Sequence, residues 1–196
     1  MLCKINWRSG MAKTIIGLIG RNGSGKDTAA NMLAQKLNAQ MIVYSGTINN
    51  ALMIFLDKEQ IGRDNQACMA AFLRGKYGDG IIAQGVKREL DKKPDGVYLL
   101  VGARDDGDYE LVRSFPGSFF IVVNADVKIR WERVRLRKEK SDDDISFDGF
   151  LANESLASEE KVASLSKLAD YVVDNSGTIK ELEAIIDNVV RKIQSV

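Results

Sequence analysis

A glycine-rich segment near the start of the chain has the residue types and the spacing of a phosphate-binding loop. Residues 20–26, called the phosphate loop below, read Gly-Arg-Asn-Gly-Ser-Gly-Lys and fit the pattern G-x-x-x-x-G-K. Glycines permit the positive backbone φ that directs consecutive N–H groups at an anion, and the lysine adds a positive charge. The sequence therefore predicts that this loop binds ATP and that Lys26 is also catalytic. The predicted ATP-binding residues of this segment are Asn22, Gly23, Ser24, Gly25, Lys26, Asp27 and Thr28.

Asp27 departs from that pattern, in which a serine or threonine follows the lysine and binds Mg²⁺ through its hydroxyl. A carboxylate also binds Mg²⁺, directly or through water, although it repels the phosphates. We therefore expect Mg²⁺ as a cofactor beside ATP, with Asp27 as its ligand. The hydroxyl of Thr28 is expected near the α-phosphate.

Short apolar runs alternate with helical patterns along the chain and must position this loop. Buried strands are predicted at residues 14–19, 41–44, 97–101, 119–123 and 171–173. Continuous apolar strands that alternate with helices are typical of a parallel sheet covered on both faces. The first strand runs directly into the phosphate loop, so the N-terminus of the helix that follows is expected to point at the bound anion.

Helical periodicity fills most of the segments between these strands. It covers about 26–37, 46–93, 126–139, 147–168 and 178–193. The second of these patterns is expected to break at glycines 62, 75, 78 and 80. The last begins at Thr178 with Glu181 three residues later, which is the spacing of a capping box.

The composition excludes several classes of function. The chain has 28 lysine and arginine residues against 27 aspartate and glutamate residues, so its net charge of +1 attracts neither nucleic acid nor an acidic membrane. Histidine is absent, which excludes Ser-His-Asp and Cys-His catalysis and a histidine-bound zinc. The two cysteines lack a metal-binding spacing and are typical of a reducing cytosol, with Cys68 expected as a buried apolar filler.

The length of 196 residues predicts one domain over residues 1–196, and we expect it in the cytoplasm. No segment is apolar over the roughly 18 residues that a membrane span needs, and residues 1–10 lack the apolar run of a signal peptide. Those ten residues are an upstream start, a cloning remnant or a small edge element, and the sequence does not distinguish these. It also does not indicate an oligomeric state.

Several segments resemble nucleoside monophosphate kinases and the related dephospho-CoA kinases. The ending Gly-Lys-Asp of the loop is similar to that of phage deoxynucleoside monophosphate kinases and animal phosphomevalonate kinases. Residues 169–178, Ala-Asp-Tyr-Val-Val-Asp-Asn-Ser-Gly-Thr, resemble the closing strand and turn of these kinases. There the turn packs beside adenine, which implies ATP-binding roles for Asn175 and Gly177. The alternative is a plain turn capped by Thr178.

Residues 127–137, Val-Lys-Ile-Arg-Trp-Glu-Arg-Val-Arg-Leu-Arg, resemble the helix that enters the lid of the same kinases. Arg130, Arg133 and Arg137 lie three and four residues apart and so share one helical face. The resemblance implies that they are catalytic and stabilise the transferred phosphoryl group when a lid at about 138–150 closes. The alternative is a solvated amphipathic helix, while nucleic-acid binding is disfavoured because no aromatic platform accompanies the arginines.

The chain is also similar, over about residues 13–194, to an archaeal family of dephospho-CoA-kinase-like P-loop proteins. Residues 62–66 and 73–78 resemble its substrate-side helices, and residues 101–104 resemble its third strand and arginine turn. In that family an Asp-Gly-x-Arg motif at this turn holds magnesium and binds substrate phosphate. The resemblance implies that Arg104 and Arg63 bind the acceptor, since arginine suits bidentate phosphate contacts. Surface arginines without a ligand are the alternative.

Two departures from the family pattern bear on the metal and the substrate. Val101 stands where the motif has aspartate, so we expect Asp27 to supply the missing carboxylate, with Asp105 and Asp106 as alternatives. Residues 44–47, Tyr-Ser-Gly-Thr, lack the acid that activates the acceptor hydroxyl in dephospho-CoA kinases. A phosphate acceptor needs no such base, because its oxygen is already anionic at neutral pH.

Taken together, the resemblance implies a three-layer α/β/α P-loop NTPase fold. Its sheet has five parallel strands in the order 2-3-1-4-5, with an acceptor-binding helical region at 46–93 and the lid at 138–150. The implied activity is ATP-dependent phosphoryl transfer to a small phosphorylated acceptor, first of all a nucleoside or deoxynucleoside monophosphate. The alternatives are dephospho-CoA kinase and, in another class, a nucleotide-dependent switch or binding protein that hydrolyses ATP slowly. Neither nucleic acid nor a membrane is an expected partner.

Overall fold

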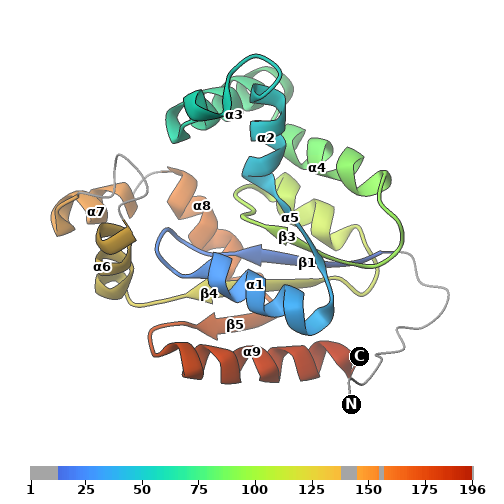
Figure 1. Ribbon diagram of the computed structural model, residues 1–196, viewed down its shortest axis with the longest axis vertical. Coiled ribbons are helices and arrows are strands. Elements are labelled where there is room, and N and C mark those ends of the chain that lie inside the picture. The colour runs from blue at the N-terminus through green and yellow to red at the C-terminus, as the bar shows by residue number, and fades with distance from the viewer. Residues whose placement is uncertain (1–12, 138–144, 155–156, 196) are drawn as a thin grey trace.

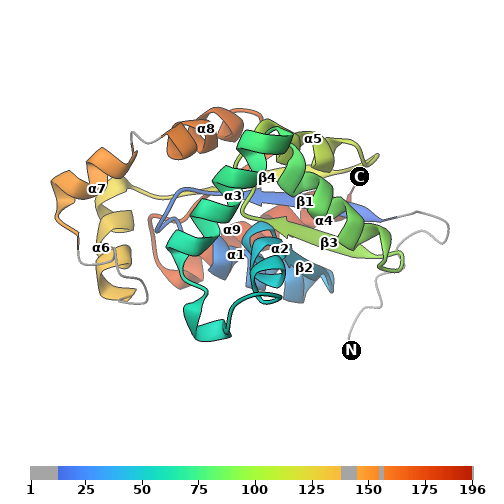
Figure 2. The ribbon, with the colours of Figure 1, turned by 90° about the horizontal axis from the view of Figure 1, so that it is seen from above.

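A central parallel sheet organises the computed structural model, which describes residues 13–137, 145–154 and 157–195. Its strands lie in the order β2-β3-β1-β4-β5 (Figures 1 and 2). They are β1 Thr14–Ile19, β2 Gln40–Val43, β3 Val97–Val101, β4 Phe119–Asn124 and β5 Tyr171–Asp174. The predicted fold class and strand order are confirmed.

Helices cover both faces of the sheet and bury an apolar core on each side (Figure 1). One face carries α1 (Lys26–Leu37) and α9 (Ile179–Gln194). The other face carries α2 (Tyr44–Leu52), α4 (Ile81–Asp91), α5 (Asp106–Arg113) and α8 (Ala157–Ser166). Because both faces are covered, the central strand β1 is buried from Ile15 to Ile19, which is why it reads as a continuous apolar run.

The remaining helices lie outside these two layers. They are α3 (Arg63–Tyr77), preceded by the short 3-10 turn η1 (Lys58–Gln60), α6 (Val127–Arg137) and α7 (Phe147–Glu154). Helices α6 and α7 lie beyond the carboxyl ends of the strands, where the phosphate loop also turns (Figure 1). This edge of the sheet is the usual place for a ligand in folds of this kind.

Three predicted boundaries are wrong. Tyr44 begins α2 instead of ending β2. Helix α3 runs through Gly75 to Tyr77, because one glycine inside a helix costs only about 1 kcal/mol and does not by itself end it. The pattern at 147–168 forms two helices, α7 and α8, instead of one.

Two side chains expected in the core lie elsewhere. Cys68 is exposed on α3 and does not fill the core. Trp131 shares a helical face with Val127 and Val134, which predicts that it packs on the sheet. Instead its ring packs edge-on against Phe147, and its indole N–H donates to the carbonyl oxygen of Ile145 at 2.8 Å. It therefore joins α6 to the start of α7.

Some expectations fall outside the part of the chain that the structure describes. These are the leader at 1–10 and residues 138–144 of the predicted lid. Within the described ranges, none of the helices has the length and apolar character that crossing a bilayer requires.

Candidate functional site

The phosphate loop has the backbone conformation that the glycine spacing predicts. Gly23 and Gly25 have φ of +77° and +80°, in the region that favours glycine. The Ser24 N–H donates to the carbonyl oxygen of Arg21 at 3.1 Å, which closes the turn. Gly25 is the N-cap residue of α1 and offers no side-chain cap. The first N–H groups of α1 and the positive end of its dipole are thus available to an anion.

Neighbouring elements support the loop so closely that only glycine fits. A Cβ atom on Gly23 would lie 2.4 Å from the carbonyl oxygen of Arg130 in α6. A Cβ atom on Gly25 would lie 2.2 Å from Nδ2 of Asn175, which donates to the carbonyl oxygen of Ser24 at 2.8 Å. Asn175 is buried, so its side chain fixes the loop; its contact with adenine stays a prediction.

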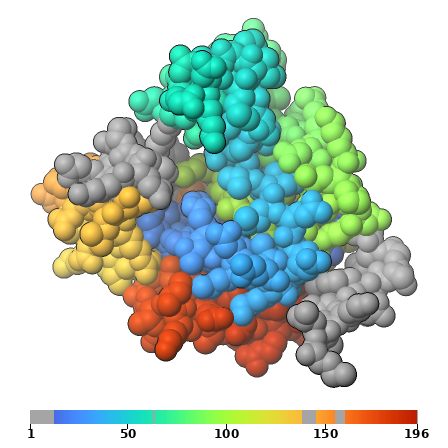
Figure 3. All heavy atoms as spheres, in the orientation of Figure 1, coloured from blue at the N-terminus to red at the C-terminus, as the bar shows by residue number. Residues whose placement is uncertain are grey.

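Lys26 ends the loop and begins α1, and Asp27 is the next residue. The Lys26 ammonium lies 3.2 Å from a carboxylate oxygen of Asp27, whose side chain is 74% exposed, and Thr28 is exposed as well. In the space-filling view the blue atoms of the phosphate loop and the first turns of α1 reach the surface beside the yellow atoms of α6 (Figure 3). A charged group at the open end of the loop is thus placed to meet phosphates from solvent.

The donor set of the described residues suits a magnesium ion that is bound mainly by substrate. No group of three or more Asp, Glu, His or Cys side chains gathers within these residues into a metal cluster. Mg²⁺ commonly takes one or two carboxylates and completes its shell with waters and phosphates. The exposed Asp27 carboxylate beside the loop fits that requirement.

The three predicted catalytic arginines of α6 do not form one exposed face. Arg130 is 3% exposed and pairs with Glu154 of α7, because it lies between the phosphate loop and α7. Arg133 lies beside the loop, with its Nη1 3.9 Å from the Cβ position of Gly25. That Nη1 is buried and has no hydrogen-bond partner among the described residues. Arg137 is the last residue of α6.

The predicted acceptor residues lie on different elements. Arg104 is half-buried in the turn after β3, and its backbone N–H donates to a carboxylate oxygen of Asp108 at 2.7 Å. Arg63 begins α3, and its side chain lies outside the described part of the structure. Val101 is buried at the end of β3, with no acid in its place. Gly177 is exposed in the turn before α9, where the predicted capping box of Thr178 and Glu181 is present.

Sequence reasoning named Asp105 and Asp106 only as alternative metal ligands and missed the ion pairs that join them to α3 and α8. Nε of Arg74 in α3 donates to Asp105 at 3.0 Å, and Lys161 of α8 pairs with Asp106. Asp105 and Asp108 form a capping box at the start of α5. Their spacing of three residues before an apolar run was the available signal. The turn that carries Arg104 is therefore tied to both α3 and α8.

Asp108 is the buried acid of this cluster. Burial and the charge of Asp105 raise its pKa to about 7, although the N–H groups of Arg104 and Asp105 and the charge of Arg74 act against that rise. Its Oδ1 is buried without a hydrogen-bond partner among the described residues. The hydroxyl of Tyr44 donates to its carbonyl oxygen at 3.2 Å, and burial raises the pKa of Tyr44, which keeps this hydroxyl protonated.

The raised pKa of Asp108 predicts how stability varies with pH. The folded chain holds this proton more tightly than the unfolded chain, whose carboxyl has a pKa near 3.8. The stabilisation of the folded chain by this proton is complete below about pH 4 and is lost as pH rises through about 7. At about 1.4 kcal/mol per pKa unit, the loss between pH 5 and pH 8 is on the order of 3 kcal/mol.

Urea unfolding at pH 5 and at pH 8 measures this effect. Asp108→Asn has no proton to lose, so its free energy of unfolding is not expected to fall in this way between pH 5 and pH 8. The stability of the variant relative to the unchanged chain is therefore expected to increase by on the order of 3 kcal/mol from pH 5 to pH 8. Asp106→Asn, at an exposed position of the same turn, is the control. An equal pH dependence in the chain with and without Asp108→Asn would contradict the assignment.

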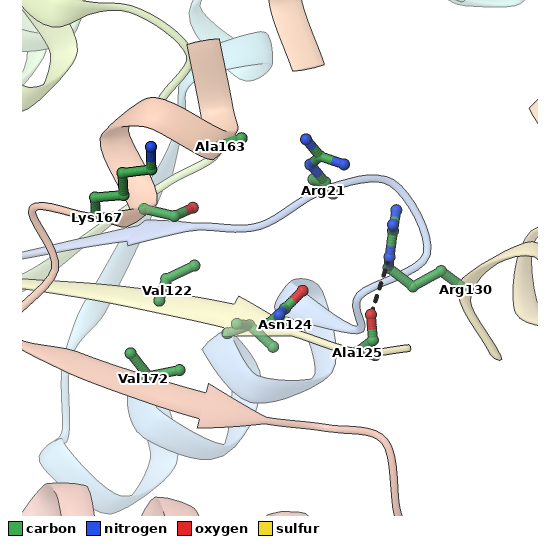
Figure 4. Close-up of a pocket in the computed structure, with 10 residues that line it drawn as sticks. Arg21, Val122, Asn124, Ala125, Arg130, Ala163, Lys167 and Val172 are labelled. Atoms are coloured by element: carbon green, nitrogen blue, oxygen red, sulfur yellow. Dashed lines mark hydrogen bonds between the residues drawn. The ribbon is translucent and has the colours of Figure 1, made fainter. Parts of the chain in front are cut away.

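A pocket of about 470 Å³ lies next to Arg21 of the phosphate loop, between α8 and strands β4 and β5 (Figure 4). Val122 and Val172 come from the two strands, and Arg21, Arg130 and Lys167 bring positive charge to it. Of the predicted functional residues only Arg130 lines this pocket, and Arg21 of the phosphate loop borders it as well.

Comparisons with known proteins agree with this architecture. The chain is 25% identical over 179 residues to a UPF0200 protein of Sulfurisphaera tokodaii, covering 91% of this chain and 97% of that protein. It is 27% identical over 190 residues to a UPF0200 protein of Pyrococcus horikoshii, covering 92% and 98%. No family model matches the chain.

Among solved structures, shikimate kinase from Bacteroides thetaiotaomicron superposes with a TM-score of 0.64. The match covers 92% of this chain and 98% of that chain, at 18% sequence identity. At this identity the likeness shows the fold alone, which this chain shares with that shikimate kinase. The finer resemblance to dephospho-CoA kinases and phage nucleotide kinases stays a prediction.

Proposed function

We propose that the chain is an ATP-dependent kinase that transfers the γ-phosphoryl group of Mg-ATP to a small phosphorylated acceptor. A nucleoside or deoxynucleoside monophosphate is the favoured acceptor class. The observation that carries the proposal is the phosphate loop, in which Gly23 and Gly25 adopt positive φ and Lys26 begins α1. The shared fold with shikimate kinase supports phosphoryl transfer over other uses of such a loop.

In this proposal the phosphates of the donor nucleotide lie against the loop, and α6 contributes arginines from one side. Loop N–H groups and Lys26 bind the β- and γ-phosphates. Arg133, whose Nη1 has no hydrogen-bond partner within the described ranges, contacts the nucleotide beside Gly25, and Arg137 stabilises the transferring group from the end of α6. Bound Mg²⁺ would neutralise charge on the phosphates, and Asp27 is the residue that would hold it.

The acceptor lies on the side of α3 and of the turn after β3. Arg104 and Arg63 bind its phosphate, and the ties from Asp105 to Arg74 and from Asp106 to Lys161 hold that turn in place. Tyr44, Ser45, Gly46 and Thr47 begin α2 without an acid, so no group at this position activates a hydroxyl. A phosphate oxygen needs no such activation, which favours a phosphorylated acceptor over dephospho-CoA.

An assay of ADP release tests the proposal. Mg-ATP is supplied with each common ribo- and deoxynucleoside monophosphate, with dephospho-CoA and with shikimate, and the Lys26→Ala variant serves as the blank. Stimulation by one nucleoside monophosphate supports the proposal. Stimulation by dephospho-CoA or shikimate would show that the enzyme is a kinase with that compound, and not a nucleoside monophosphate, as its acceptor. Tight ATP binding without stimulation by any acceptor favours the nucleotide-dependent switch instead.

The role of Asp27 predicts a change in magnesium dependence. Asp27→Ala is expected to raise the Mg²⁺ concentration for half-maximal ADP release by roughly tenfold, because the ion loses its protein ligand. Asp27→Ser restores the usual hydroxyl and is expected to preserve the magnesium dependence. If Asp27→Ala leaves that dependence and the turnover unchanged, the carboxylate does not replace the acid missing at Val101.

A further inference from the structure

We propose that Glu154 is a positioning residue for the phosphate loop, acting through Arg130 and Arg21. Glu154 ends α7, far along the chain from the loop, and its side chain is 11% exposed. Its Oε1 accepts from Nη1 of Arg130 at 2.8 Å and its Oε2 from Nη2 at 2.6 Å. Oε2 also accepts from Nη1 of Arg21 at 2.5 Å. One carboxylate therefore holds two guanidinium groups.

The first of these, Arg130, contacts the loop in two ways. Its Nη1 donates to the carbonyl oxygen of Asn22 at 3.3 Å, and its Nε donates at 3.1 Å to the carbonyl oxygen of Ala125, the residue after β4. Its own carbonyl oxygen fills the space where a side chain on Gly23 would stand. Since the Asn22 carbonyl is directed at Arg130, it is not directed at a bound phosphate.

The second, Arg21, belongs to the loop itself. Its pairing with Glu154 attaches the first half of the loop to α7, across a separation of 133 residues. The guanidinium of Arg130 also lies over the ring of Phe150 in α7, 5.6 Å from its centroid. The loop, α6 and α7 thus form one connected unit with Glu154 at its centre.

The charges explain why a carboxylate is needed at this position. Arg130 has only 4% of its side chain exposed, so without Glu154 its charge would stand buried and unpaired beside that of Arg21. Burial acts to raise the pKa of Glu154, but the hydrogen bonds and charges of Arg130 and Arg21 outweigh burial and lower it. The carboxylate therefore stays ionised at neutral pH. A bidentate pair of this kind also fixes orientation, which a single hydrogen bond does not.

A competing role for Glu154 predicts the opposite effect of its removal on activity. Glu154 would then restrain Arg130 from reaching the transferred phosphoryl group, and its removal would raise kcat. The positioning role predicts instead that its removal weakens the binding of ATP phosphates, because the loop N–H groups lose their alignment. This inference rests on the proposed function only in assuming that the loop binds ATP.

Titration calorimetry with Mg-ATP alone, without an acceptor, tests the proposal. Glu154→Gln keeps the shape but removes the charge, and its Kd for Mg-ATP is expected to rise about tenfold or more. Glu154→Asp keeps the charge but is one methylene shorter, so we expect a rise of about threefold and a fold like that of the unchanged chain. Glu132→Gln, an exposed glutamate of α6, is the matched control and is expected to bind Mg-ATP normally.

Steady-state kinetics complete the test once an acceptor is known. Glu154→Gln is expected to raise KM for ATP about tenfold with kcat within about threefold of the unchanged chain. If Glu154→Gln does not fold, Glu154→Asp alone decides. Mg-ATP affinity within twofold of the unchanged chain in the folded variants, or a rise in kcat, would overturn the positioning role. If no acceptor is found, the proposed kinase activity is contradicted, while the titration with Mg-ATP still tests the positioning role of Glu154.

Discussion

Lys26→Ala is expected to lower acceptor-stimulated ADP release by about 10²–10³-fold or more while the fold is preserved. The side chain of Lys26 stands at the end of a loop whose other contribution to anion binding is backbone dipoles. It is the one charged side chain that the G-x-x-x-x-G-K pattern itself places on the phosphates. Its ammonium neutralises charge in the transition state, and an alanine offers nothing in its place.

The measurement is ADP release with the best acceptor of the panel, together with circular dichroism and thermal unfolding. Lys36→Ala is a matched control at the opposite end of α1, where Lys36 pairs with Asp187 on α9. That pair is partly exposed, so its loss is expected to cost about 1 kcal/mol or less and to leave turnover unchanged. If Lys26→Ala releases ADP at a rate within tenfold of the unchanged chain, the phosphate loop does not take part in the reaction.

The residues of the loop illustrate what the sequence predicts well. Gly25 stands directly before Lys26 as the pattern requires, and its positive φ agrees with the role of glycine in such a loop. Gly23 occupies a variable position of the pattern, and its positive φ agrees with the general freedom of glycine. The parallel sheet follows in the same way from continuous apolar runs, because burial on both faces leaves no polar positions to alternate. The loop residues are close together in the sequence, and the strands are buried on both faces, so in each case a local pattern is enough for the prediction.

Arg130 and Glu154 illustrate what the sequence leaves open. Helical spacing groups Arg130 with Arg133, but it does not say that α6 turns Arg130 inward beneath the loop, where Asn22 and Glu154 pair with it. That depends on where α7 lies relative to α6, which no local pattern encodes. Cys68 shows the reverse case, since a residue type that is usually buried lies exposed on a helix outside the core.

Gly23→Ala is expected to abolish detectable binding of Mg-ATP, with a Kd at least about 100-fold higher. Two independent effects act in the same direction. A Cβ atom at φ of +77° is strained, and it would lie 2.4 Å from the backbone carbonyl oxygen of Arg130. A backbone atom held in α6 cannot move aside as a flexible side chain can, so the loop must open.

Two other glycines make this prediction specific to the contact with α6. Gly25→Ala also has positive φ, but its Cβ would meet the side chain of Asn175 at 2.2 Å, which Asn175→Ala removes. We therefore expect the double substitution Gly25→Ala with Asn175→Ala to bind Mg-ATP more tightly than Gly25→Ala alone. No second substitution of a side chain relieves Gly23→Ala, because its obstacle is backbone.

Gly75→Ala is the control for glycine replacement as such. It lies within α3, and apart from its own helical turn no atom of the described residues lies within 4 Å of its Cβ position. Alanine there is expected to leave Mg-ATP binding unchanged and to raise the free energy of unfolding by up to about 1 kcal/mol, since helix propensity improves. If Gly23→Ala and Gly75→Ala bind Mg-ATP equally well, the loop does not hold phosphate in the conformation described. If Gly23→Ala alone fails while its thermal unfolding stays cooperative, the positive φ and the close approach of α6 together confine this position to glycine.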